Sequence, residues 1–184
     1  MSVDALWYLS RGSGLVTLVL LTVVVVLGIG ARNGRPAFGL PQFGVAALHR
    51  NASLMSLAFL GVHVVTLLFD PYAQLRVADL VIPFQGAYRP LWVGLGTLAS
   101  DMLLALVVTS LLRLRLGLRR WRLVHWLAYA AWPVALLHAL SAGTDAATAW
   151  LRAIALVCAG TVLGALVWRW TVPVAAPARV DGSR

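Results

Sequence analysis

The sequence predicts an all-α integral membrane helical bundle of five transmembrane helices, with the N-terminus outside and the C-terminus in the cytoplasm. Hydrophobic residues make up 61% of the chain and charged residues 11%, whereas soluble domains have about 45–50% and about 25%. Uncharged stretches of about the 20 residues that cross a bilayer recur along the chain. Arginines gather in alternate connections between these stretches, a pattern typical of multi-pass membrane proteins.

Each apolar stretch is too long for a β-strand, and backbone groups in lipid must be hydrogen-bonded within their own segment. We therefore expect helices at 6–29, 46–69, 91–112, 123–142 and 147–170, the third interrupted by Asp101. The first could be a signal peptide, but MSVDALWYLS contains no basic region and no small-residue cleavage site follows, so we expect a retained helix. Residues 1–172 would form one domain and 173–184 a short cytoplasmic tail.

The 15 basic residues are all arginines, and their placement predicts the topology. Arginine is abundant after the first, third and fifth spans: Arg32, Arg35 and Arg50; Arg113, Arg115, Arg119, Arg120 and Arg122; Arg169, Arg179 and Arg184. The two other connections balance arginine against aspartate. The positive-inside rule then puts the arginine-rich connections in the cytoplasm. The net charge of +9 thus reports topology, and we expect a lipid bilayer and no nucleic acid as partner.

The only four histidines of the chain form two pairs within two apolar spans, His49 with His63 and His125 with His138. Ionisable side chains at membrane depth are costly and indicate function. Because the second and fourth spans run in the same direction, His49 is level with His125 and His63 with His138. The 14 and 13 residue steps within the spans correspond to about 21 and about 20 Å along a helix. The spacing predicts two metal centres, one near each membrane surface.

Two histidines per level suit haem better than zinc, because zinc sites use four ligands or three and a water. Haem brings four nitrogens, and two axial imidazoles complete the iron coordination. The chain has one cysteine, Cys158, and no C-x-x-C-H motif, which predicts non-covalently bound haem b, two per chain. Alternatively, the histidines are ordinary polar residues bonded inside a bundle.

The rotation of the side chains around the fourth span is less regular than their depth. Fourteen steps at about 100° fall about 40° short of four turns, but thirteen steps fall about 140° short. Pro133 lies between His125 and His138 and removes a helical hydrogen bond. We expect a kink at Pro133 that corrects the rotation.

Several other polar residues lie near the predicted haem levels. We expect Arg11, in the outer leaflet, to contact an outer-haem propionate or to snorkel to the interface. Arg50, Arg119 and Arg122 could neutralise inner propionates or serve topology alone. Asp101 is interpreted as a structural hydrogen-bond acceptor or a proton-linked group. The segment 74–86 is expected to form a short interfacial helix or a lid over the outer haem.

The H-x13-H and H-x12-H pairs, with Arg11 in WYLSRGSGL, resemble the ferric reductase-like transmembrane domain. NADPH oxidases, ferric reductases and the haem-bearing membrane subunit of the bacterial methionine sulfoxide reductase system share this domain. The resemblance covers about residues 6–170. It implies that His49 and His125 ligate the inner haem, and His63 and His138 the outer haem.

The chain departs from the family pattern at both ends. The family usually has six helices with the histidines on the third and fifth, so we expect the family's first helix to be missing here. Many members continue into a flavin and nicotinamide domain, whereas this sequence stops after VPVAAPARVDGSR. We therefore expect a separate cytoplasmic electron donor, a flavoprotein or a ferredoxin-type reductase. Some relatives bind a flavin mononucleotide (FMN), which no motif here supports or excludes.

The resemblance implies a haem-dependent transmembrane oxidoreductase component in a bacterial cytoplasmic membrane. This cytochrome b would move electrons from the cytoplasmic donor through two haems to an acceptor on the outer face. Two other functions stay open: a proton-coupled transporter that uses Asp101, Arg11 and the histidines, and a non-catalytic anchor subunit. Ferric iron, oxygen, a quinone, an external flavin or a methionine-repair protein could be the acceptor.

Overall fold

The structure is a computed structural model that describes residues 3–31, 37 and 39–171. The described part contains helices and no β-strand. The α-helices are α1 (Val3–Ala31), α2 (Gln42–Leu68), α3 (Pro90–Leu111), α4 (Arg113–Leu116), α5 (Leu118–His125), α6 (Ala128–Ala142) and α7 (Ala149–Thr171), and the 3₁₀ helices are η1 (Val77–Leu80) and η2 (Thr144–Ala147). The predicted tail, 173–184, lies outside the described residues, as do Arg32, Arg35, Arg179 and Arg184.

Five helical segments are long and apolar enough to cross a membrane, which confirms the predicted all-α bundle. They cover 5–31, 42–68, 90–111, 118–142 and 149–171. The fourth segment joins α5 and α6 through a tight turn at Trp126–Leu127. Which end of the bundle faces the cytoplasm stays a prediction.

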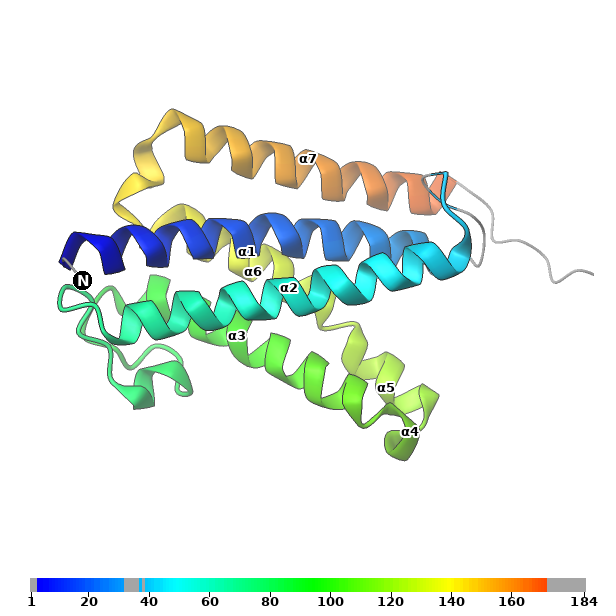
Figure 1. The fold of residues 1–184 in the computed structure, drawn as a ribbon, viewed down its shortest axis with the longest axis horizontal. Coiled ribbons are helices and arrows are strands. Elements are labelled where there is room, and N and C mark those ends of the chain that lie inside the picture. Colours follow the sequence, from blue (N-terminus) through cyan, green and yellow to red (C-terminus); the bar gives the residue numbers. More distant parts are fainter. Residues whose placement is uncertain (1–2, 32–36, 38, 172–184) are drawn as a thin grey trace, which may run out of the picture.

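The helices form two antiparallel pairs, α1 with α2 and α3 with α6, which make the most extensive helix contacts. Figure 1 shows α1 between α2 and α7, with α6 behind it and α3 below. We call the end at which α1 begins the N-terminal end, and the end that carries α4 and α5 the arginine-rich end. The bundle thus places the histidine-bearing α2 and α6 on neighbouring pairs, each beside its own partner helix.

Buried hydroxyls run along α1 at Ser10, Ser13, Thr17 and Thr22. Each donates to a backbone carbonyl of its own helix, so none is left unpaired in an apolar setting. Thr22 also accepts a 2.9 Å hydrogen bond from the buried Trp132 indole. Because the Trp132 ring packs against Leu21, Cys158 and Val162, it fixes α6 between α1 and α7.

The expected change in winding lies at the α5–α6 turn rather than at Pro133, which lies inside the continuous α6. Four backbone bonds near Trp126–Leu127 join residues three apart, as in a 3₁₀ helix. Each such residue turns the chain about 20° further than an α-helical one, so four add about 80°. This recovers more than half of the rotation that the sequence spacing lacked. Arg169 braces the turn, since its guanidinium lies 5.2 Å from the Trp126 ring centre and donates to the Tyr129 hydroxyl.

Replacing Gly94 by alanine should destabilise the protein, because Gly94 is buried beneath the segment that precedes α3. A Cβ there would lie 2.6 Å from the backbone nitrogen of Phe84, which cannot move aside as a flexible side chain could. We expect Gly94→Ala to cost about 1–3 kcal/mol, measured by thermal unfolding of the purified protein. Gly160→Ala on α7 is the control, because nothing lies within 4 Å of its Cβ position. Equal stability of the two variants would contradict this packing.

Candidate functional site

His63 of α2 and His138 of α6 face each other across the bundle. Their ring centres lie 6.3 Å apart with an angle of 76° between the ring planes. A metal ion bound by one nitrogen of each ring, at about 2 Å from each, requires ring centres about 6 Å apart. The pair therefore has the spacing of two imidazoles that share one metal between them.

The Nδ1 atoms of three histidines are bonded to backbone carbonyls of the neighbouring helix. His63 Nδ1 lies 2.6 Å from the Ser10 oxygen, His138 Nδ1 2.8 Å from that of Trp92, and His49 Nδ1 3.0 Å from that of Val24. A carbonyl oxygen only accepts hydrogen bonds, so each Nδ1 carries the proton and donates. This fixes the tautomer and the ring orientation, and leaves Nε2 as the metal-binding atom.

A glycine lies under each of these three imidazoles. An added Cβ would lie 2.9 Å from the His63 ring at Gly14, 3.3 Å from the His49 ring at Gly28, and 2.6 Å from the His138 ring at Gly96. In each case the glycine follows the accepting carbonyl by four residues: Ser10 and Gly14, Val24 and Gly28, Trp92 and Gly96. Only residues without a Cβ let the imidazole come this close to the partner helix.

Sequence reasoning missed these glycines, although a signal for two of them was present. Gly14 and Gly28 are 14 residues apart, as are His49 and His63. Because α1 and α2 are antiparallel, equal spacing lets the same glycine contact repeat at both levels.

The second pair, His49 and His125, lies toward the arginine-rich end, and the two imidazoles interact electrostatically. His125 is held differently from the other three. Its ring stacks on Trp121, with ring centres 4.8 Å apart and planes inclined by 30°. Its buried Nδ1 has no hydrogen-bond partner. The structure therefore brings the predicted partners together at both levels but supports one of them without a backbone contact.

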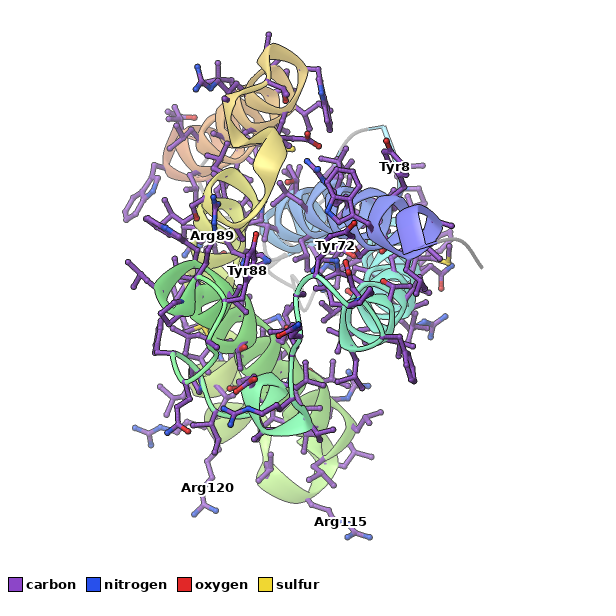
Figure 2. All side chains as sticks on the ribbon, turned by 90° about the vertical axis from the view of Figure 1, so that its left-hand side faces the viewer. Tyr8, Tyr72, Tyr88, Arg89, Arg115 and Arg120 are labelled. Carbon is purple, nitrogen blue, oxygen red and sulfur yellow. The ribbon has the colours of Figure 1, made fainter. Side chains whose placement is uncertain are left out.

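A cavity of about 480 Å³ contains His63 and His138, which is within the range of about 300–1,000 Å³ for cofactor sites. Its walls come from α1, α2, α3, α6 and the segment before α3, and are mostly apolar. Tyr72 and Tyr88 also line it. Figure 2 views the bundle from the N-terminal end and shows Tyr88 on the side of α3 and Tyr72 on the side of α1 and α2.

The predicted arginines lie at opposite ends of the bundle. Arg11 lines the cavity, forms an ion pair with Asp145 and lies 4.2 Å from the centre of the Trp7 ring. Arg50 and Arg122 are exposed at the arginine-rich end. Figure 2 shows Arg115 and Arg120 of the same end pointing away from the helices. Contacts of Arg11, Arg50 and Arg122 with haem propionates stay predictions.

The predicted lid is a short 3₁₀ helix, η1, whose flanking Leu75 and Val81 line the cavity. The buried Asp79 carboxylate accepts bonds from the Arg76 backbone at 2.9 Å and from its guanidinium at 3.0 Å. The Asp79 carbonyl accepts the Thr97 hydroxyl of α3 at 2.8 Å. Hydrogen bonds from Arg76 hold the pKa of Asp79 below its usual value. Asp79 thus ties the lid both to itself and to α3.

A family model described as ferric reductase like transmembrane component matches residues 13–136, about two thirds of the chain. The matched range includes His49, His63 and His125, and ends two residues before His138. No curated protein and no solved structure matches the chain significantly.

Lowering the pH should loosen the lid. Because the folded-state pKa of Asp79 is lowered, its stabilisation is complete above the unfolded value of about 4 and is lost as the pH falls through the folded one. We expect the hydrogen-exchange protection of residues 76–81, corrected for intrinsic rates, to be constant from neutral pH to about pH 5 and to decrease below about pH 4. Asp79→Asn should lower the protection at every pH and abolish this dependence. Wild-type protection in Asp79→Asn at neutral pH would disprove the role of the carboxylate.

Proposed function

The chain belongs to the ferric reductase-like transmembrane component family, and we propose that it is an electron-transfer cytochrome with one haem b at each histidine pair. It is a multi-pass membrane protein of an oxidoreductase-type family whose members generally bind haem. Bound haem supplies an iron centre that accepts and releases single electrons. The observation that carries the proposal is the facing His63–His138 pair, with both Nδ1 atoms donated to backbone carbonyls.

The residues of the site fit haem by three criteria. Two imidazoles on opposite sides would fill both axial positions, which favours electron transfer over ligand binding at the iron. Donation of Nδ1–H to a carbonyl makes each Nε2 a better electron donor. Within the residues that the structure describes, no three His, Cys, Asp or Glu side chains gather as a protein-only metal site would require.

The charged residues would then orient the cofactors. Arg11 is close enough to the cavity to bind a carboxylate of the outer group in place of, or together with, Asp145. Arg50 and Arg122 would neutralise the carboxylates of the inner group. No contact in the structure favours an FMN site.

The direction of transfer follows from the proposed topology. The arginine-rich end would face the cytoplasm of a bacterial cell and receive electrons from a separate flavoprotein or ferredoxin-type donor. An acceptor would bind at the N-terminal end, where the cavity, Tyr72 and Tyr88 lie. With the cytoplasm negative, each electron moved outward gains about 2.3 kcal/mol per 100 mV.

Purified protein from haem-replete cells should have the reducible absorption spectrum of a b-type cytochrome and about two haems per chain. His63→Ala should lower the content to about one, because only the outer pair loses a ligand. Haem assay per chain and difference spectroscopy measure both values. A haem-free wild-type preparation would contradict the proposal. A transporter would then be tested by proton-coupled flux, and an anchor by tolerance to loss of all four histidines.

Alanine at Gly14 should also remove the outer haem, although Gly14 ligates nothing. Its Cβ would lie 2.9 Å from both Cε1 and Nδ1 of His63 and would displace the ring from the Ser10 carbonyl. We expect about one haem per chain in Gly14→Ala and about two in Gly12→Ala. Gly12 is the matched control, because it lies on the same helix with nothing within 4 Å of its Cβ position. Equal haem content in the two variants would show that the glycine does not position His63.

A further inference from the structure

We infer that Thr109 and Trp121 are positioning residues for His125, and that they give the inner haem a less negative reduction potential than a fourth carbonyl contact would. The inference rests on the proposed function, because it concerns a haem held by His49 and His125. Its starting point is that three histidines share one arrangement of carbonyl and glycine, and the fourth does not.

The position of the missing contact follows from the antiparallel α3–α6 pair. His138 lies beside the Trp92 carbonyl and Gly96. Moving 13 residues back from His138 reaches His125, and moving 13 residues forward along α3 reaches Ala105 and Thr109. Ala105 and Thr109 are therefore the counterparts of Trp92 and Gly96 at the inner level.

Thr109 closes this position in two ways. Its hydroxyl donates to the Ala105 carbonyl at 2.7 Å, so that oxygen already has a side-chain donor. Its β-branched side chain also lies where the other three contacts have a glycine. The buried Nδ1 of His125 accordingly has no hydrogen-bond partner.

Trp121 supplies the support that the carbonyl does not. It precedes His125 by one helical turn on α5, and the two rings are stacked at 4.8 Å. The Trp121 indole donates to the Ser110 hydroxyl of α3 at 3.2 Å, which anchors the stack to the partner helix. Trp121 therefore fixes the plane of the His125 ring without bonding to Nδ1.

The difference alters the electronic character of the ligand. An imidazole that donates Nδ1–H to a carbonyl is a stronger electron donor and stabilises ferric iron. The outer pair has two such imidazoles and the inner pair has one. Of the two levels, the inner one is therefore the more easily reduced as far as this cause is concerned, and an electron from the donor is held there before it moves outward.

Redox titration of the full chain in lipid nanodiscs tests the role of Thr109. Thr109→Gly uncovers the Ala105 carbonyl, so the midpoint potential of one of the two redox steps should become more negative while the other is unchanged. Thr109→Val is the matched control, because it keeps the branched shape over the carbonyl and should leave both potentials unchanged. An unaltered Thr109→Gly, or an equal shift in Thr109→Val, overturns the inference. Repeating the titration in a His63→Ala background identifies the responding step as the inner one.

A second pair of variants tests the stack. Trp121→Phe keeps an aromatic face for His125 and should retain the inner haem and its absorption spectrum, whereas Trp121→Leu should lose or perturb that haem alone. Identical spectra for Trp121→Leu and wild type would refute the stacking role. A wild-type chain without haem would contradict the proposed function itself. Two haems whose potentials do not respond to Thr109→Gly would contradict only this inference.

Discussion

Access of an imidazole to a carbonyl inside a neighbouring helix is the constraint on which this structure depends. Such a carbonyl already accepts the backbone N–H four residues further on, and the side chain of that residue covers its remaining lone pair. A glycine at that position uncovers the oxygen and lets the ring lie against the backbone. In an apolar environment without water, this contact satisfies Nδ1 and points Nε2 toward the metal site. The separation of the paired helices and their register both follow from it.

The sequence was sufficient for features that depend on local composition or on axial spacing. Apolar length predicted the five spans, and the positions of His63 and His138 along parallel spans predicted that they meet. Features that depend on the relative rotation of two helices were not predictable in this way. The glycines under the imidazoles belong to partner helices distant in sequence, and Arg11 pairs with Asp145 from the far side of the bundle.

Pro133 shows why a residue-based prediction of distortion was wrong in position. Proline removes one helical bond, but a membrane helix tolerates this where neighbours satisfy the freed carbonyl. The rotation between His125 and His138 is instead supplied by 3₁₀ bonds at the α5–α6 turn, beneath Arg169 of α7. No local sequence signal marks this turn, because its winding is determined by what packs on it.

The α1–α2 hairpin and the α3–α6 pair have the same direction and the same division of labour between a supporting helix and a ligand helix. A twofold homodimer of one such hairpin would present four imidazoles at two depths, with identical halves. Tandem duplication of a hairpin gene is therefore sufficient to account for the architecture. Once both copies lie on one chain, each half is free to diverge, and Thr109 in place of glycine is the kind of asymmetry that a homodimer could not have acquired on one side alone.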